Sequence, residues 1–250
     1  YSHQSLGPEQ LALVSDGPTW WAAERIEVID KDVTVALRLS QGVRVTGRIV
    51  FEGPRPKPDP SALRTRGVYL RGLDHRFFAP VPLGPPRENE TFRTVAVPPG
   101  RYALGMLDSF DGFQLESVKV GGQEVAGVSF DLSRDVNDAV LTFSSRATVL
   151  TGAIPGEAGQ RRFVLVWPLD EALWTASGTQ MGRVYRAVTT DGPYKLPVYP
   201  GTYRVVALAG LPPADWESTR YLRSLLPYSE KVIVAAGQTV VYNPTVIPRR

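Results

Sequence analysis

The chain alternates apolar and polar residues over short stretches that end at glycine or proline. In Val43-Arg44-Val45-Thr46-Gly47-Arg48-Ile49, the apolar residues Val43, Val45 and Ile49 fall on one side of an extended backbone, because the side chains of a strand alternate between its faces. Gly121-Gly122 has the composition of a hairpin turn. The same pattern predicts further strands in the first half of the chain over residues 67–71, 92–97, 101–107, 115–120, 125–132 and 139–143.

The second half of the chain repeats this order. Residues 147–154 match residues 43–50 in their alternation, and both stretches contain Thr-Gly. The last two apolar stretches are separated by Ala236-Gly237-Gln238 and are expected to form a closing hairpin. Strands are predicted in this half over residues 147–154, 163–167, 194–198, 202–208, 232–234 and 239–242.

A turn motif recurs at the distance of one module. Pro99-Gly100 precedes Tyr102 and Pro200-Gly201 precedes Tyr203, 101 residues further on. Proline presets φ for a turn and glycine supplies the positive φ of a type II turn, so each pair is expected to join two strands. The tyrosine that follows, Tyr102 or Tyr203, is expected to point inward. About 100 residues with about seven short strands is the size of a two-sheet β-sandwich. The fold is therefore predicted to be all-β, with tandem immunoglobulin-like or prealbumin-like antiparallel β-sandwiches over 43–144 and 145–250.

Residues 1–42 are predicted to hold the C-terminal strands of an incomplete β-sandwich module. Their spacing follows that of residues 113–132, with three corresponding pairs: Val28 with Val120, Asp32 with Glu124, and Leu39 with Leu132 after a gap of one residue. So few strands are marginal in water, because they cannot bury their apolar sides alone. Two explanations remain open. Another subunit completes the module by β-strand addition, or the front half of the module belongs to a longer polypeptide.

One short helix is predicted over residues 215–226, as an insertion in the last module. Asp215 is expected to cap its start, and Pro227 ends the stretch. Its apolar side chains fall on one face of the helix: Tyr221, Leu222, Leu225 and Leu226.

These stretches resemble tandem carboxypeptidase-regulatory-like modules, which are small prealbumin-like or immunoglobulin-like sandwiches of exported bacterial proteins. The resemblance rests on the opening strand at 45–53, on Val97-Pro98-Pro99-Gly100-Arg101-Tyr102, and on the hairpin at 117–122. The family is named after a non-catalytic accessory domain, so the resemblance implies a fold and no peptidase activity. It also implies an exported protein, located outside the cell, at the cell surface or in the periplasm of a bacterium.

Composition and charge exclude several classes of function. The net charge is +3, and the arginines are scattered without a basic stripe beside aromatic residues, which argues against nucleic-acid binding. The absence of cysteine excludes disulfides, thiolate metal sites and cysteine nucleophiles. No run approaches the roughly 20 apolar residues of a transmembrane helix.

No catalytic, metal or cofactor site is predicted, and the chain is not expected to be an enzyme. Its two histidines, His3 and His75, stand in neither a metal-binding nor a triad-like spacing. Asp108 and Asp111 precede Gly112, and both residue types favour polar turns. We expect no cofactor for the same reasons.

The five tryptophans are expected to serve packing first. Burial of one tryptophan removes roughly 150–250 Å² from water, so a core or an interface is the default place for them. Trp20 and Trp21 are neighbours on a predicted strand and point to opposite faces, so at most one of them faces the local core. A platform for sugar rings is the alternative, with Trp174 or Trp216 as its aromatic surface.

The sequence therefore predicts a non-enzymatic protein that assembles with other protein subunits, copies of itself first, at the cell surface or in an extracellular filament. Alternatives are a carbohydrate-binding module that takes a glycan, and an accessory subunit of a large envelope complex. The predicted contact residues are Leu11, Leu13, Trp20, Trp21, Ile26, Trp216 and Leu222.

Overall fold

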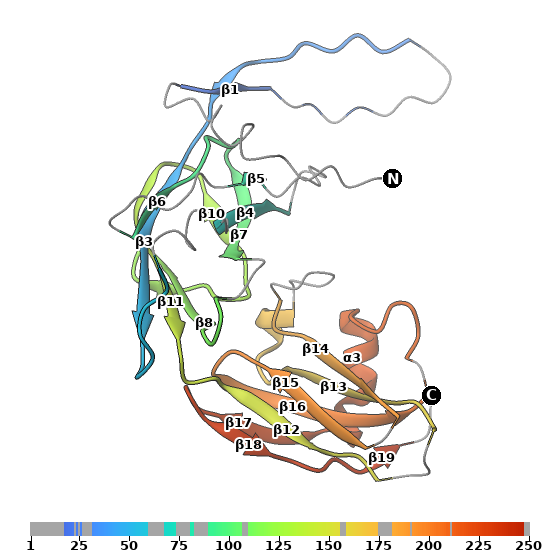
Figure 1. Cartoon of the computed structure of the whole chain (residues 1–250). Coiled ribbons are helices and arrows are strands. Elements are labelled where there is room, and N and C mark those ends of the chain that lie inside the picture. The colour runs from blue at the N-terminus through green and yellow to red at the C-terminus, as the bar shows by residue number, and fades with distance from the viewer. Residues whose placement is uncertain are drawn as a thin grey trace.

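The fold is built from β-strands in several sheets, with α3 (Thr219–Leu225) as the one α-helix of the described residues (Figure 1). The computed structural model describes residues 18–22, 24, 26, 32–59, 68–73, 81–82, 90–106, 110–155, 159–174, 182–190, 192–210 and 212–247. This confirms the predicted all-β class with an inserted helix. Among the described residues, no helix is long and apolar enough to cross a membrane.

Residues 45–144 form two sheets around one apolar core. The sheet orders are β6-β3-β11-β8-β9 and β10-β7-β4-β5. The core includes Val45, Leu104, Val118 and Phe143, all nearly fully buried. The strands are β3 (Val45–Glu52), β4 (Val68–Gly72), β5 (Val81–Pro82), β6 (Thr91–Arg93), β7 (Gly100–Met106), β8 (Gln114–Val120), β9 (Gln123–Glu124), β10 (Phe130–Leu132) and β11 (Val136–Ser144).

Residues 149–247 form a second pair of sheets. Their orders are β15-β12-β18 and β14-β13-β16-β17, with β19 beside β16. The strands are β12 (Val149–Ala153), β13 (Arg162–Pro168), β14 (Tyr185–Thr189), β15 (Pro193–Pro197), β16 (Gly201–Ala209), β17 (Glu230–Val234), β18 (Thr239–Val241) and β19 (Val246–Ile247). Two short 3-10 helices accompany them, η1 (Glu171–Trp174) and η2 (Leu226–Tyr228). The division of the chain into three modules, with boundaries at residues 42 and 144, stays a prediction.

The two pairs of sheets share one pattern of strand pairing. In the first pair of sheets, β3 pairs antiparallel with β6 and parallel with β11. In the second, β12 pairs antiparallel with β15 and parallel with β18. The repeated Thr-Gly lies at this parallel contact. A Cβ atom on Gly47 would come within 2.1 Å of the carbonyl oxygen of Ala139, so the close approach of the two strands requires glycine.

The two inward tyrosines make the same hydrogen bond. The hydroxyl of Tyr102 donates to the carbonyl oxygen of Pro98, and that of Tyr203 donates to the carbonyl oxygen of Tyr199, both at 2.6 Å. Both rings are buried, as predicted. The expected positive φ is wrong for Gly100 and Gly201, because each is the first residue of a strand with extended backbone. Gly121 and Gly122 do have positive φ, 58° and 75°, and form the predicted hairpin turn.

The predicted closing hairpin is wrong. β17 pairs with β16, whereas β18 pairs with β12 in the other sheet, so the chain crosses from one sheet to the other at Ala236-Gly237. The same crossing joins β10 to β11 in the first pair of sheets. Periodicity finds strands but does not tell which neighbour each strand takes.

The helix is shorter than predicted and has a different cap. The hydroxyl of Ser218, not Asp215, accepts a hydrogen bond from the backbone N–H of Tyr221 at 3.2 Å. Asp215 lies three residues earlier, in a turn in which its carbonyl oxygen accepts a hydrogen bond from the backbone N–H of Ser218 at 2.8 Å. α3 occupies the place in the chain between β16 and β17 that the hairpin β8–β9 occupies between β7 and β10.

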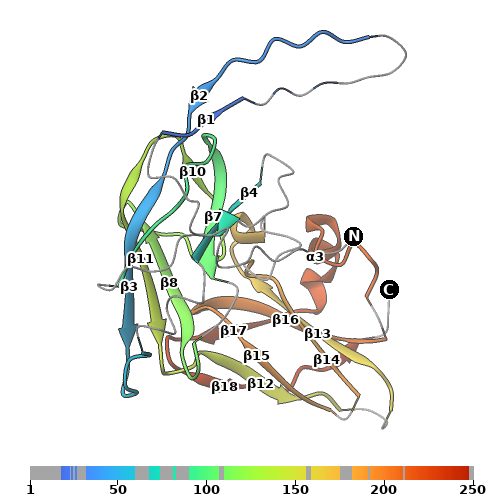
Figure 2. The same cartoon turned by 45° about the horizontal axis from the view of Figure 1, so that its top comes forward.

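The described part of residues 18–42 lies at the end of the first pair of sheets that is remote from the second pair (Figure 2). β1 (Trp20–Trp21) and β2 (Ser40–Gln41) pair antiparallel at its base. Residues 32–39 have no regular secondary structure, so no strand of the predicted incomplete module is formed over these residues. We call residues 18–42 the N-terminal arm.

Candidate interaction surface

The N-terminal arm is fixed to the first pair of sheets through Trp21. The indole Nε1 of Trp21 donates to the carbonyl oxygen of Ala96 at 3.1 Å. The ring lies against Gly42, where an added Cβ would come within 3.0 Å of two ring atoms. Beyond Gly42, Val43 and Val97 exchange two backbone hydrogen bonds of 2.8 and 2.9 Å. Trp21 therefore anchors the base of the arm.

Trp20 points away from this contact, as its neighbour relationship with Trp21 predicts. Its side chain is 56% exposed. Five of the ten large apolar side chains exposed in the described part of the chain belong to the arm, namely Trp20, Ile26, Val33, Leu37 and Leu39. Such a concentration of exposed large apolar side chains in one segment is typical of an interaction surface.

Residues 32–39 combine this exposure with an unpaired backbone. Leu37 and Leu39 are 63% and 64% exposed, and together with Val33 and the half-buried Val35 they recur at a period of two. No backbone hydrogen bond joins residues 32–39 to another described residue. A segment with an apolar face and free N–H and C=O groups is a template for pairing with a sheet edge. We call residues 32–39 the apolar segment.

The predicted contact residues at the helix differ in exposure. Leu222 is fully buried, in a core cluster with Phe163, Leu165 and Trp167. It packs the helix onto the sheet and is not accessible to a partner, so we correct the expectation that it contacts one. Trp216 is half-buried, with the guanidinium of Arg186 5.1 Å from its ring centroid. Its role in a contact stays a prediction.

The predicted contacts at Leu11 and Leu13 lie outside the described residues, as do His3 and His75. Trp20 and Ile26 are exposed and available, whereas Trp21 is already engaged with Ala96. The sequence analysis did not single out Val33, Leu37 and Leu39 as contact candidates, although all three belong to the incomplete module predicted over residues 1–42. Their period of two was the signal.

Trp174, which was considered for sugar binding, is part of the core, and so is Trp167. Trp167 is fully buried, and Trp174 is 3% exposed with its indole N–H donating to the carbonyl oxygen of Pro168 at 2.7 Å. A buried ring cannot stack on a sugar, so Trp174 does not serve as a glycan platform in this conformation.

The first and second pairs of sheets are joined by polar contacts at β8. The side-chain amide of Gln114 donates to the carbonyl oxygen of Val198 at 3.0 Å and accepts from the N–H of Thr148 at 3.2 Å. Arg183 donates to the carbonyl oxygen of Ala126 at 2.7 Å and lies 5.2 Å from the ring centroid of Tyr199. The ring of Tyr199 packs against the core of the first pair of sheets.

Burial at this junction changes the acidity of its tyrosines. Burial raises the pKa of the Tyr199 hydroxyl to about 12, although the nearby guanidinium of Arg183 opposes the shift. Burial also raises the pKa of Tyr203 and, more strongly, that of Tyr185. These hydroxyls stay neutral at physiological pH and act as packing and hydrogen-bonding groups.

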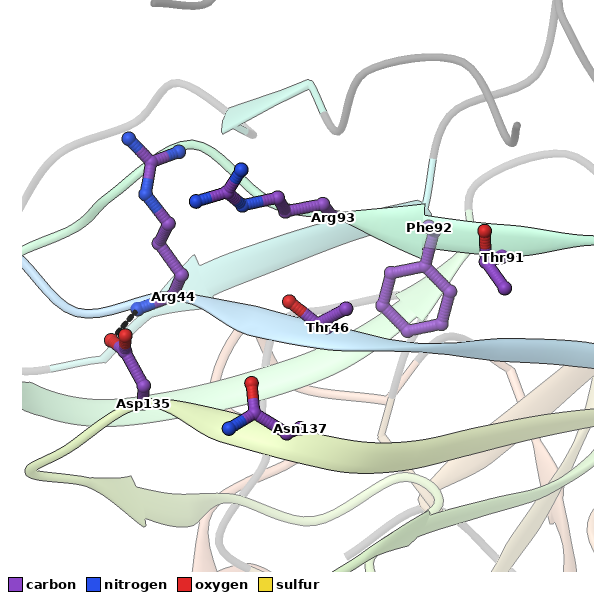
Figure 3. Close-up of a pocket in the computed structure, with 7 residues that line it drawn as sticks. All are labelled: Arg44, Thr46, Thr91, Phe92, Arg93, Asp135 and Asn137. Carbon is purple, nitrogen blue, oxygen red and sulfur yellow. Dashed lines mark hydrogen bonds between the residues drawn. The ribbon is translucent and has the colours of Figure 1, made fainter. Parts of the chain in front are cut away.

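A pocket of ≈ 310 Å³ lies beside β3 and β6 (Figure 3). Asp135 accepts a hydrogen bond from the backbone N–H of Arg44 at 2.9 Å, and the Arg44 side chain donates to the carbonyl oxygen of Thr94 at 3.1 Å. The lining residues are Arg44, Thr46, Thr91, Phe92, Arg93, Asp135 and Asn137. They include no nucleophile paired with a base. Among the described residues, no group of three His, Asp or Glu side chains is placed to hold a metal.

No protein-family model matches the chain, and no curated protein matches it. Several solved structures show a distant likeness. The Bacillus anthracis TIE protein has 7% identity and a TM-score of 0.26, covering 86% of this chain and 37% of its own. BcpA, the major pilin subunit of Bacillus cereus, has 9% identity and a TM-score of 0.27, covering 82% and 98%. A DUF3823 family protein from Parabacteroides merdae has 12% identity and a TM-score of 0.29, covering 77% and 96%. This chain thus spans about a third of the length of the TIE protein.

Proposed function

We propose that this chain is a non-enzymatic structural subunit that joins other protein subunits through its apolar segment, residues 32–39. The observation that carries the proposal is the coincidence of exposed Val33, Leu37 and Leu39 with a backbone that pairs with no described residue. Addition of this segment to a sheet edge of another subunit would satisfy the backbone groups and bury the apolar side chains in one step.

The rest of the molecule supports a scaffold role. The described residues form well-packed sheets, and Gln114, Arg183 and Tyr199 fix the two pairs of sheets to each other. Trp21 holds the base of the arm, so the apolar segment begins from a defined place on this scaffold. We place the protein outside the cell or at the cell surface of a bacterium, in an assembly of tandem β-sandwich subunits.

Association of the purified chain tests this function. The double variant Leu37→Asp with Leu39→Asp places two carboxylates where apolar burial is needed, and we expect it to weaken association by about a hundredfold, or roughly tenfold for each buried leucine lost. The matched control is Thr34→Asp with Arg38→Asp, which changes exposed polar positions of the same segment. Sedimentation velocity over a range of concentrations measures both.

Two results would contradict the proposal. One is a chain that stays monomeric at every concentration and co-purifies with no stoichiometric partner. The other is an equal loss of association in both double variants, because a nonspecific charge effect does not distinguish the two faces. Stoichiometric co-purification of different proteins, abolished only by the Leu37→Asp/Leu39→Asp variant, would place the chain as a subunit of a mixed envelope complex.

A further inference from the structure

We infer that the acceptor for the apolar segment is the outer edge of β18 in a second copy of this chain. The inference rests on the proposed function and adds the identity of the acceptor. Its starting point is a difference between the two pairs of sheets. In the first, the last strand β11 has β3 on one side and β8 on the other. In the second, β18 has β12 on one side, and no described strand lies on its other side.

The chain itself explains this difference. The residues between β7 and β10 form the hairpin β8–β9, and β8 adds to β11. The residues between β16 and β17 form α3 instead, which packs on the opposite sheet through Leu222 and Leu225. The helix therefore leaves the edge of β18 without the neighbour that β11 has. A strand from elsewhere would take the place beside β18 that β8 takes beside β11 in the order β6-β3-β11-β8-β9.

The backbone of β18 offers the groups that such a strand needs. The carbonyl of Gln238 and the N–H of Tyr242 bond to β12. Because strand residues alternate in the direction of their backbone groups, Thr239 and Val241 direct theirs away from β12. The Val241 side chain is 69% exposed, the largest exposure among the large apolar residues of the described chain. Val240, Tyr242 and Val246 pack on the core but remain only half-buried.

Donor and acceptor match in chemistry. The apolar segment supplies alternating apolar side chains and an unpaired backbone, and β18 supplies an apolar flank and an unpaired edge. The apolar segment contains one acid, Asp32, and one base, Arg38, whereas β17 and β18 together contain Glu230 and Lys231. Neither side carries a net charge, so no like-charge repulsion opposes the contact.

We assign the occupant to a second copy because a second copy carries the matching apolar segment, whereas a molecule's own segment and its own β18 lie at opposite ends. Both views show the N-terminal arm at one end and β18 at the other (Figures 1 and 2). One copy therefore does not cover its own edge. The contact joins different surfaces of the two copies, and such head-to-tail contacts repeat into a filament when the rotation does not close a ring.

Disulfide trapping tests the acceptor directly, since the chain has no cysteine of its own. Donor variants carry Thr34→Cys, Ala36→Cys or Arg38→Cys, three exposed positions that alternate with the apolar ones. Each full-length donor is mixed with full-length Val241→Cys under mild oxidation. The matched control is Val188→Cys, on the edge strand β14, which is also exposed (53%).

We expect one donor position to cross-link to Val241→Cys at least roughly tenfold faster than to Val188→Cys, because pairing raises the effective concentration of the two thiols. Equal rates for both acceptors would overturn the inference. If Leu37→Asp abolishes association while cross-linking shows no preference for Val241→Cys, the segment has another acceptor and the proposed function stands. If the unmodified chain does not associate with itself but co-purifies with a different stoichiometric partner, the inference fails and the proposed function stands; if it does neither, both fail together.

A charge at the edge gives an independent readout. Val241→Lys is expected to weaken self-association by about tenfold or more, because a lysine on an edge strand opposes strand addition. Val188→Lys is expected to leave it within about twofold, since β14 is not the acceptor. Urea unfolding of both variants checks that each remains folded. Equal weakening by the two lysines would contradict the assignment of β18.

Discussion

Gly152 lies directly against the backbone of Tyr242, whose carbonyl oxygen would be 1.9 Å from a Cβ atom at that position. The contact holds β12 and β18 in their parallel pairing and repeats the contact of Gly47 with Ala139. No side chain fits between the strands. The backbone must move to admit even a methyl group.

Gly152→Ala is therefore expected to lower the free energy of unfolding by about 1–3 kcal/mol or more. Gly201→Ala is the matched control, because a Cβ there meets the ring of Tyr203 at an ordinary 3.4 Å and its φ lies outside the left-handed region. The control is expected to change the free energy of unfolding by less than about 0.5 kcal/mol. Urea unfolding followed by circular dichroism measures both. Equal unfolding midpoints would show that the close approach is not rigid.

Removal of the hydroxyl of a buried tyrosine is predicted to lower the free energy of unfolding less than Gly152→Ala does. Tyr102→Phe and Tyr203→Phe each delete a 2.6 Å hydrogen bond and leave a carbonyl oxygen without that donor. We expect each to lower the free energy of unfolding by about 1 kcal/mol. If the two pairs of sheets are equivalent in this respect, the two losses agree within about 0.5 kcal/mol. A loss of stability in only one of the two variants would show that the two hydrogen bonds, although alike in geometry, contribute differently to stability.

Stability is predicted to fall at alkaline pH. Burial raises the pKa of Tyr199 and of Tyr194 to about 12, above the value of about 10 for an unfolded chain. Folding favours their neutral forms, so this contribution is complete below pH 10 and is lost as the pH rises from about 10 through about 12. The midpoint of urea unfolding, measured at pH 8, 10 and 11.5, is expected to fall mainly over the last step. Tyr199→Phe, which has no ionisable hydroxyl, is expected to show a smaller fall, and an identical fall would contradict this assignment.

Trp20 and Trp21, which are adjacent in the arm, are predicted to differ in how much each contributes to the free energy of unfolding. Trp21→Ala removes the contacts with Gly42 and Ala96, and we expect a loss of about 3 kcal/mol, near the lower end for a well-packed tryptophan because the ring is half-buried. Trp20→Ala removes an exposed ring and is expected to change the free energy of unfolding by less than about 0.5 kcal/mol. Limited proteolysis gives a second readout, since the arm of Trp21→Ala should be cut faster. Similar behaviour of both variants would mean that Trp21 is not the anchor.

The two pairs of sheets are predicted to unfold together as long as Gln114 bridges them. Gln114→Ala removes the hydrogen bonds to Val198 and Thr148. Scanning calorimetry of this variant is expected to show one broadened or two separate transitions in place of one. Gln123→Ala, at an exposed position of the neighbouring strand β9, is the control. A single sharp transition in both variants would show that Arg183 and Tyr199 suffice for the coupling.

Much of the fold follows from local patterns in the sequence. Alternation located β3, β7, β8, β13 and β16 to within one or two residues, because each strand has one buried face or lies wholly in the core. Tyr102 and Tyr203 were predicted to point inward from their place after a turn. Pairing partners were harder to predict, since β17 and β18 lie close in sequence and belong to different sheets.

The candidate interaction surface could also be predicted only in part, because the sequence shows local patterns but not which elements pack together. The apolar surplus of residues 1–42 and the opposite directions of Trp20 and Trp21 are visible in the sequence. The burial of Leu222 is not visible in the sequence. An amphipathic pattern shows that a helix has an apolar face, but not whether that face packs on the protein's own sheet or on another protein. The open edge of β18 depends on the replacement of a hairpin by a helix, and only the three-dimensional arrangement shows it.

The parallel pairing of β3 with β11 and of β12 with β18 also determines how the molecule responds to tension. In the second pair of sheets, β12 and β18 run side by side in the same direction, but the chain continues from β18 to β19 beside β16. In the first pair, the chain enters at the start of β3 and leaves at the end of β11, and these two strands run side by side in the same direction. A pull on the two ends therefore drags one strand lengthwise past the other, and the hydrogen bonds between them resist together instead of opening one by one. Such shear geometry suits a link in a chain under mechanical load.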